Sequence, residues 1–262
     1  MKRITKSIIS FVAVLALTLA LAIPVFAADS ITPSTGTQIV YLTSTDTSVI
    51  SHSYISLASG TKNFTIKRTE TKVAPGTTGA KMTTFNKNIN SYNSTSSYSI
   101  SGKWNTTTYS SSNCNYSADF SINKPGTATI SYKIGTKTYK TKLKVLAYKN
   151  PVKSITLTGI NGGKNFASLT KSSANISKKL SLKTTTKNAQ LNITPTSGWK
   201  ISSVSISDSN TTLSRSVSNY RDGLSSAKIN WGTLNKSHSY NISVTFFNTS
   251  NHASIHIYYP IN

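Results

Sequence analysis

Acidic side chains are scarce in this chain. Its 262 residues include 29 lysines and arginines but only six carboxylates, and the formal charge at pH 7 is +23. The six are Asp29, Asp46, Glu70, Asp119, Asp208 and Asp222. Glycosidases and oxygen-ligated metal sites depend on carboxylates that converge, so we expect a non-enzymatic protein with no cofactor and no metal site. A glycan hydrolase is the third hypothesis, and it would need a cleft that joins Glu70 to Asp46 or Asp119.

Cysteine is nearly absent as well. Because Cys114 is the only one, no disulfide can form within the chain, and a chain of this length can bury a core without one. A buried, unreactive thiol is the favoured interpretation of Cys114. Pairing between two chains, or a reactive thiol, is the alternative.

The first residues have the pattern of a secretory signal. Three basic residues precede an apolar run over residues 8–23, and Val25-Phe26-Ala27 fits the small-x-small rule for cleavage. We therefore predict a signal peptide over residues 1–27, with a retained membrane anchor as the alternative. Cleavage leaves 26 basic and six acidic residues, or +20, and no transmembrane segment in the mature chain. No Leu-Pro-x-Thr-Gly sorting motif is present, so we expect no covalent attachment to a cell wall.

Apolar and polar residues alternate over residues 127–145, which predicts a β-hairpin. Gly135-Thr136 suits a two-residue turn. Pairing outward from this turn sets Tyr132 opposite Tyr139 and Ala128 opposite Leu143. The same register sets Ser131, Thr129 and Thr127 opposite Lys140, Lys142 and Lys144, so that no two lysines are directly opposed.

Short strands of this kind recur along the chain, and no stretch has the pattern of a long amphipathic helix. Further strands are expected at residues 38–43, 48–57, 63–68, 97–102, 118–122, 152–158, 179–184, 190–194, 199–207, 227–231, 239–247 and 253–259. Pro151 disfavours strand pairing and marks a joint near residue 150. The predicted fold class is therefore all-β, with two consecutive Ig-like antiparallel β-sandwich domains over residues 28–149 and 150–262.

Two segments resemble known modules. Lys124-Pro125-Gly126-Thr127-Ala128-Thr129-Ile130, followed by a lysine-rich strand, resembles the final hairpin of bacterial immunoglobulin-like domains of the group 2 type. Residues 193–204 and 240–246 resemble another Ig-like module of bacterial surface proteins. These resemblances imply an exported protein of a Gram-positive-like bacterium. Adhesins, wall proteins and enzymes all use such modules as spacers, so no activity is implied.

The lysines of the predicted hairpin are the leading candidate site. Lys133, Lys140, Lys142 and Lys144 would project from one sheet surface, and ammonium groups about 7 Å apart along a strand can follow a phosphate or sulfate polymer. The competing interpretation is that these lysines protect an exposed sheet edge from pairing with other chains. A net charge of this size favours attraction to anionic wall polymers, and to nucleic acid only nonspecifically.

Aromatic residues and histidines offer further sites. Trp104, Trp199 and Trp231 could stack on sugar rings if they are exposed, whereas core packing is the competing interpretation for them. His252 and His256 would lie about 13 Å apart on one strand, too far apart to share a metal ion.

Some surface adhesins that resemble these modules carry a self-formed Lys-Asn isopeptide cross-link promoted by a buried acid. In the second half, Lys153, Asp208 and Asn241 (or Asn248) could supply its parts.

The leading hypothesis is a non-enzymatic exported bacterial protein, secreted or held noncovalently at the cell wall. It would serve adhesion to a host or matrix surface, or the binding of an anionic cell-wall polymer or glycan. The alternative is an accessory carbohydrate-binding protein with aromatic platforms.

Overall fold

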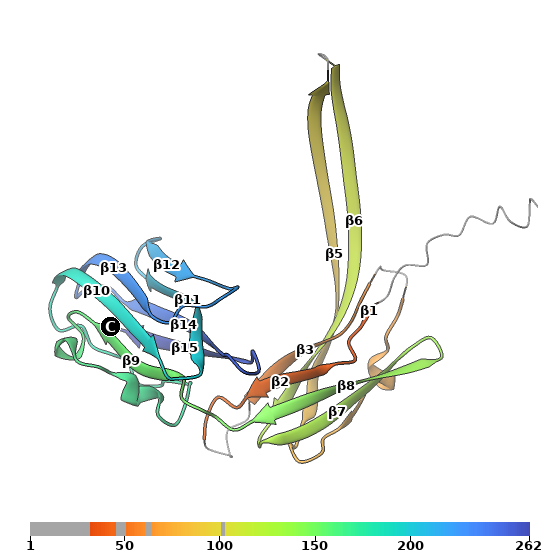
Figure 1. Cartoon of the computed structure of the whole chain (residues 1–262), viewed down its shortest axis with the longest axis horizontal. Helices are drawn as coiled ribbons and strands as arrows, with labels where there is room; N and C mark the ends of the chain where they lie inside the picture. Colours follow the sequence, from red (N-terminus) through yellow and green to blue (C-terminus); the bar gives the residue numbers. More distant parts are fainter. Residues whose placement is uncertain (1–31, 46–50, 61–63, 101–102) are drawn as a thin grey trace, which may run out of the picture.

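The computed structural model describes residues 32–45, 51–60, 64–100 and 103–262 (Figure 1). The predicted signal peptide, Asp29 and Asp46 lie outside the described residues. Within these residues, strands dominate and helical structure is confined to three short 3-10 turns, η1 (Arg68–Glu70), η2 (Asn161–Gly163) and η3 (Ala167–Thr170). The predicted all-β fold class is confirmed.

The first half of the chain forms two four-stranded sheets, with strand orders β1-β3-β6-β5 and β2-β8-β7-β4. When the strands are lettered along the chain, these sheets become A-B-E-D and A′-G-F-C, which is the strand division of an immunoglobulin domain. Strand β2 pairs in parallel with β8. The bounds are β1 Thr32–Pro33, β2 Thr37–Tyr41, β3 Ser51–Gly60, β4 Lys72–Ala74, β5 Lys81–Ile100, β6 Lys103–Ile122, β7 Gly126–Ile134 and β8 Lys137–Leu146.

The predicted register of the β7–β8 hairpin is confirmed. Tyr132 lies opposite Tyr139 and Ala128 opposite Leu143, and the two tyrosine rings stack with their centroids 5.7 Å apart. The buried hydroxyl of Tyr132 donates to the carbonyl oxygen of Ser34 at 3.0 Å, and burial raises the pKa of Tyr132 to about 12. The turn before the hairpin requires glycine at Gly126, because φ is 147° and a Cβ would collide with Thr77 Oγ1.

Strands β5 and β6 are each 20 residues long and extend beyond the sandwich as a two-stranded arm (Figure 1). They keep one antiparallel register from the pair of Thr84 with Asp119 to the pair of Ile100 with Lys103. Strand β3 accompanies β6 only as far as the pair of Gly60 with Cys114. The sequence predicted strands over 97–102 and 118–122 alone. The intervening residues are mostly Ser, Thr and Asn, so the apolar alternation that marks a half-buried strand is missing there.

The second half also forms two antiparallel sheets, β9-β10-β13 and β12-β11-β14-β15. When the strands are lettered in chain order, the two sheets become A-B-E and C′-C-F-G. This is the Ig-like division, except that β12, the strand between C and E, pairs in the second sheet. The bounds are β9 Val152–Leu157, β10 Thr186–Pro195, β11 Trp199–Asp208, β12 Ser214–Ser218, β13 Ala227–Leu234, β14 Tyr240–Asn248 and β15 Ser254–Ile261.

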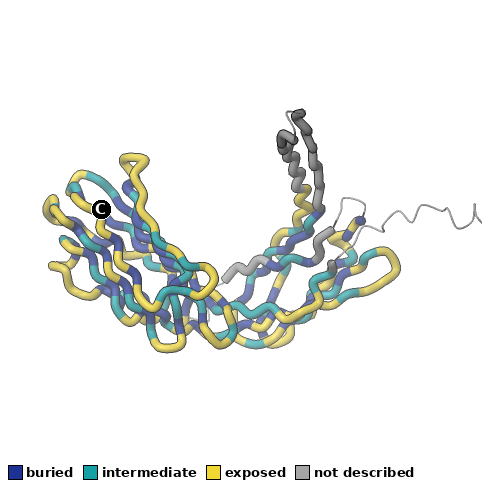
Figure 2. Tube along the Cα trace, turned by 45° about the horizontal axis from the view of Figure 1, so that its top comes forward, coloured by how far each residue is buried: buried dark blue, intermediate teal, exposed yellow. Residues whose placement is uncertain are grey.

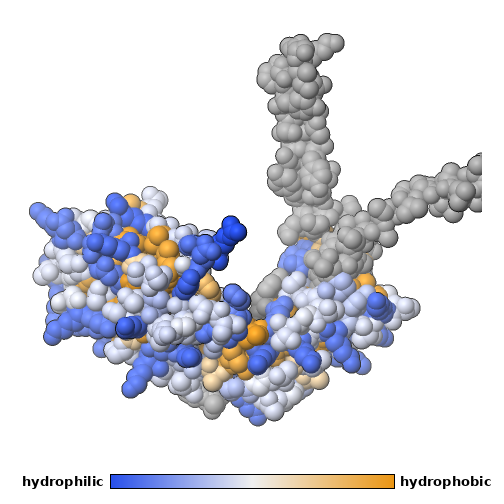
Figure 3. Space-filling view, viewed as in Figure 1, coloured by the Kyte–Doolittle hydropathy of each residue, from blue (hydrophilic) through white to orange (hydrophobic). Residues whose placement is uncertain are grey.

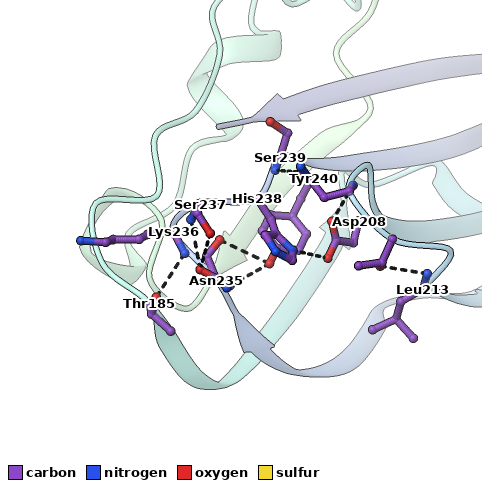
Figure 4. Close-up of polar contacts among 11 residues, drawn as sticks. Thr185, Asp208, Leu213, Asn235, Lys236, Ser237, His238, Ser239 and Tyr240 are labelled. Carbon is purple, nitrogen blue, oxygen red and sulfur yellow. Dashed lines mark hydrogen bonds and ion pairs between the residues drawn. The ribbon is translucent and has the colours of Figure 1, made fainter.

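Tyr240, the first residue of β14, fixes the turn that follows β13. Its hydroxyl oxygen accepts a hydrogen bond from the backbone N–H of Asn235 at 2.7 Å and donates to the carbonyl oxygen of Asn235 at 3.4 Å (Figure 4). Its ring packs edge-on against Trp231 with centroids 5.7 Å apart. A tyrosine at the start of strand F that bonds to the backbone a few residues upstream is the tyrosine corner of Ig-like sandwiches.

Buried apolar residues gather in two clusters, one from Leu42 to Val145 and the other from Tyr148 to Ile261. In Figure 2, buried positions recur along the strands of each sandwich. Tyr41 joins the two halves, since its ring lies 5.1 Å from that of Trp199 and its hydroxyl accepts a hydrogen bond from Asn251 Nδ2 at 3.1 Å. The domain boundary at residues 149 and 150 stays a prediction, which the two separate cores support.

Other details of the strand prediction are wrong. Residues 64–67 form no strand and residues 179–184 form only isolated bridges, while β1, β4 and β12 were not predicted. Phe64, Ile66, Leu180 and Leu182 are all buried, so these extended loops alternate inward and outward like strands without pairing as strands. Strand β12 has only one partly buried apolar residue, Val217. In the described part of the chain, no helix has the length and apolar character that crossing a membrane requires.

Replacement of Tyr240 by Phe tests the tyrosine corner. Tyr240→Phe removes both hydrogen bonds to Asn235 and keeps the ring in the core, so the free energy of unfolding should fall by about 1 kcal/mol. Tyr258, on the neighbouring strand, is 45% exposed, and Tyr258→Phe should change the free energy of unfolding by less than about 0.5 kcal/mol. Urea unfolding followed by circular dichroism measures both, and equal effects of the two changes would contradict the role of the corner.

Candidate anion-binding surface

The four predicted lysines project from the outer surface of the β2-β8-β7-β4 sheet. Lys140, Lys142 and Lys144 are exposed and alternate with Thr141, Leu143 and Val145, which are buried. Lys133 is exposed on β7 and lies opposite Thr138. Since successive outward residues of one strand lie about 7 Å apart, the structure places all four predicted lysines on one face.

A fifth lysine, Lys72 on β4, joins this group and was missed in the sequence. Lys72 lies opposite Ser131, and Ser131 lies opposite Lys140, so Lys72 and Lys140 flank one serine across three adjacent strands, about 10 Å apart. We call Lys72, Lys133, Lys140, Lys142 and Lys144 the lysine face. The signal for Lys72 was hidden because its strand is three residues long and its pairing is not local.

A hollow of about 340 Å³ opens at one end of the lysine face. Its lining includes Lys72, Lys133, Ser131, Thr138 and the carboxylate-bearing Glu70. Among the described residues, no lysine of the face forms an ion pair, since the ion pair found there joins Asp208 and His238. The ammonium groups of the lysine face are therefore available to an external anion.

The interpretation of these lysines as edge protection is wrong for Lys142 and Lys144. Strand β8 lies between β2 and β7, with β2 paired alongside residues 142–146. The backbone N–H of Lys142 also donates to the carbonyl oxygen of Gly36 at 3.1 Å. Lys142 and Lys144 therefore lie on the interior of a sheet, where no open edge needs protection.

Net charge does not distinguish the first sandwich from the second. Of the 26 basic residues beyond residue 27, 13 precede residue 146 and 13 follow it. Figure 3 likewise shows strongly hydrophilic side chains over both sandwiches on the face in view. What distinguishes the lysine face is the arrangement of five lysines on adjacent strands of one sheet.

Two of the three tryptophans are core residues. Trp199 and Trp231 are each 3% exposed and belong to the core of the second sandwich, so they cannot stack on a sugar ring. Trp104 lies on β6, opposite Ser99, and its side chain is outside the described residues. The aromatic platform predicted as the alternative site is thus not formed by Trp199 or Trp231, because a sandwich needs large side chains between its sheets.

The three residues of the predicted isopeptide link lie on different parts of the second sandwich. Lys153 is exposed near the start of β9, in the three-stranded sheet, whereas Asn241 faces outward from β14, in the four-stranded sheet. The amide of Asn241 donates to Ser209 Oγ at 2.8 Å. Asp208, at the end of β11, binds His238 instead of either residue. The structure does not bring the three side chains together.

Asp208 and His238 form a pair that ties two loops to the end of the second sandwich (Figure 4). Asp208 Oδ2 lies 2.7 Å from His238 Nδ1, with side chains 6% and 28% exposed. Burial alone would raise the pKa of Asp208, but the hydrogen bonds from His238 and from the backbone N–H of Asn210 hold this pKa below its usual value. The neighbouring Ser237 Oγ donates to Asn235 Oδ1, so Ser237 does not complete a Ser-His-Asp relay. The pair links the end of β11 to the loop before β14.

The other polar candidates are dispersed. Asp119 faces outward from β6 and accepts a hydrogen bond from Thr84 Oγ1, while Glu70 lies in η1 beside the opposite sheet. His256 lies near Ser243 and Thr245, 3.0 Å from Thr245 Oγ1. In the residues that the structure describes, no three His, Cys, Asp or Glu side chains gather into a metal site. Cys114 is a buried free thiol in the core of the first sandwich.

No protein-family model and no curated protein sequence matches the chain. Among solved structures, the chain is similar to a chimeric titin Z1Z2-Z1Z2 tandem, with 9% identity, 89% of this chain and 97% of that chain covered, and a TM-score of 0.20. It is also similar to the adhesin InvE of Yersinia pseudotuberculosis, with 8% identity, coverages of 90% and 58%, and a TM-score of 0.20. For domains 5-6 of the S-layer protein SbsC, the identity is 14%, the coverages are 89% and 96%, and the TM-score is 0.22. These TM-scores are too low to carry an argument, so the Ig-like fold rests on the strand order and on Tyr240.

Replacement of Asp208 by Asn tests the pair with His238. Asp208→Asn keeps the shape of the side chain but cannot ionise. The folded-state pKa of Asp208 lies below the unfolded value of about 3.9, so the stabilisation is fully present above the unfolded pKa and is lost as the pH falls through the folded pKa. The melting temperature of the wild type should exceed that of the variant at pH 6, and the gap should close below about pH 4.

Thermal unfolding followed by circular dichroism at a series of pH values measures this gap. Asp222→Asn, at an exposed residue in a turn, serves as the control and should leave the melting temperature unchanged throughout. A gap for Asp208→Asn that stays constant down to pH 2 would exclude ionisation as its cause.

Proposed function

We propose that this chain is a non-enzymatic exported bacterial protein that binds an anionic polymer of the cell envelope through the lysine face. The observation that carries the proposal is the convergence of five exposed lysines, from β4, β7 and β8, on one sheet surface. A polymer with regularly spaced phosphates or sulfates would meet positive groups about 7 Å apart along β8 and about 10 Å apart across the strands. Each contact releases bound counterions, which gives affinity without sequence-specific readout.

The hydroxyl groups between the lysines support the same function. Thr127, Thr129 and Ser131 lie opposite Lys144, Lys142 and Lys140, so hydroxyl donors alternate with ammonium groups over the face. The outward positions of β4, β7 and β8 include no carboxylate. An anion on this face therefore meets donors and positive charge, with Glu70 at one border only.

The modular organisation is part of the proposal. We assign residues 28–149 to a first sandwich of the bacterial group 2 Ig-like type, because the Pro125-Gly126 turn leads directly into the β7–β8 hairpin. Residues 150–262 form the second module. Cleavage after Ala27 and noncovalent retention at the cell wall, or release outside the cell, complete this proposal, and the charge of +20 that remains supports retention.

Neutralising part of the lysine face should weaken binding and reduce its dependence on salt. In the triple variant Lys140→Gln, Lys142→Gln and Lys144→Gln, the slope of log affinity against log salt concentration should fall in magnitude by about two to three. Binding of long-chain polyphosphate and of heparin, measured by isothermal titration between 50 and 300 mM NaCl, gives this slope. Affinity for the wild type that does not change with salt would exclude the electrostatic mechanism.

A matched variant separates the lysine face from net charge. Lys164→Gln, Lys187→Gln and Lys228→Gln remove the same charge from exposed positions of the second sandwich. This variant should keep most of the affinity and of the salt dependence. If the two triple variants lose affinity equally, binding follows total charge and the lysine face is not a site.

A further inference from the structure

The β5–β6 arm leaves a long strand edge without a partner. Strand β5 is the last strand of its sheet, and over the described residues only β6 pairs with it, through Ile100. The backbone N–H and C=O groups on its outer edge are therefore open to another strand. This outer edge runs along the whole of β5, from the sandwich to Ile100, and β5 is 20 residues long.

The part of this edge that lies on the sandwich is protected, and the part on the arm is not. Near the sandwich, β5 contains Lys81 and Lys87 and a register shift between Met82 and Thr84. Lysines and bulges of this kind prevent edge-to-edge pairing. From residue 89 to residue 100 the strand contains no charged residue and no proline. The arm segment of this edge therefore lacks the protection that the sandwich segment has.

Charge indicates what kind of partner fits this edge. Residues 89–113 contain one charged side chain, Lys103, and 17 of these 25 residues are Ser, Thr or Asn. An anionic or cationic partner finds no complementary charge on such a segment. An identical neutral strand does fit, because strand pairing uses the backbone, and Ser, Thr and Asn can pair across strands.

The length of the arm removes the main obstacle to pairing two copies, which is repulsion between chains of charge +20. Residues 90–100 span about 35 Å as an extended strand, whereas charges are screened beyond about 8 Å at physiological salt. In an antiparallel pair of arms, the two sandwiches lie at opposite ends of the paired strands. The arms can therefore meet while the basic sandwiches stay several screening lengths apart.

We propose that the chain forms a dimer in which the arm edges of two β5 strands pair antiparallel about Thr95, the midpoint of Asn90–Ile100. The pairing is isologous, as in most symmetric dimers, and joins the arms of two copies into a four-stranded sheet, with β6-β5 of one copy beside β5-β6 of the other. It also stabilises the arm, since a two-stranded hairpin is marginally stable alone. The inference is independent of polymer binding.

Charged substitutions at the centre of the arm test this dimer. In one variant Thr95 and Ser97 are both replaced by Lys, and in a second variant both are replaced by Glu. Pairing about residue 95, 96 or 97 then brings like charges opposite each other, so each variant alone should dimerise at least about tenfold more weakly than the wild type. An equimolar mixture of the two variants should recover dimerisation, because opposite charges then meet.

Sedimentation velocity of the chain from Ala28 on, at 10 to 200 µM and 0.15 M NaCl, measures the association. The control variant Ser205→Lys with Ser207→Lys adds the same charge to β11, which has neighbours on both sides, and should dimerise like the wild type. Circular dichroism confirms that each variant keeps its sandwiches folded. A wild type that stays monomeric at 200 µM, a mixture that stays monomeric, or a control as weak as the Lys variant would each overturn the proposal.

Discussion

The burial of every second side chain between two facing sheets is the constraint on which the rest of this structure depends. Cys114 is a free thiol, and the ion pair within the described residues joins Asp208 and His238, so covalent and ionic links contribute little to the fold. Stability must come from the two apolar cores, where large side chains such as Tyr132, Phe120, Tyr240 and Phe246 are fully enclosed. Each strand then has an outward row that the core does not constrain.

That outward row explains how the chain tolerates its charge. In β8, Thr141, Leu143 and Val145 fill the core while Lys140, Lys142 and Lys144 stay in water, so the lysines incur no desolvation cost in the folded protein. Because the outward positions of β8 do not pack in the core, core packing does not determine which residue types occupy them. A cluster of five lysines, with Glu70 at one border, concentrates positive potential on a single sheet, and this potential is the physical basis of the proposed polymer binding.

Strand edges divide the molecule in a second way. β2 pairs with part of the edge of β8, and lysines and a register shift protect the edge of β5 near the sandwich. The arm, in contrast, extends an uncharged and unpaired edge away from both sandwiches (Figure 1). In the proposed dimer, this separation would limit repulsion between the two basic sandwiches, because charges more than about 8 Å apart are largely screened at physiological salt. The lysine face and the arm therefore place the proposed polymer binding and the proposed self-association on different parts of the first half of the chain.

The sequence alone determined those features that depend on local periodicity. The β7–β8 register followed from the alternation on both sides of Gly135-Thr136, and the all-β class followed from repeated short alternating segments. Long-range pairing decided the rest. It placed Lys72 beside Ser131, it buried Trp199 and Trp231, and it kept Lys153, Asp208 and Asn241 apart. It also extended β5 and β6 through polar residues whose pattern predicts no strand. These residues form strands because each strand supplies the backbone hydrogen bonds of the other, and a local sequence pattern does not identify the partner strand.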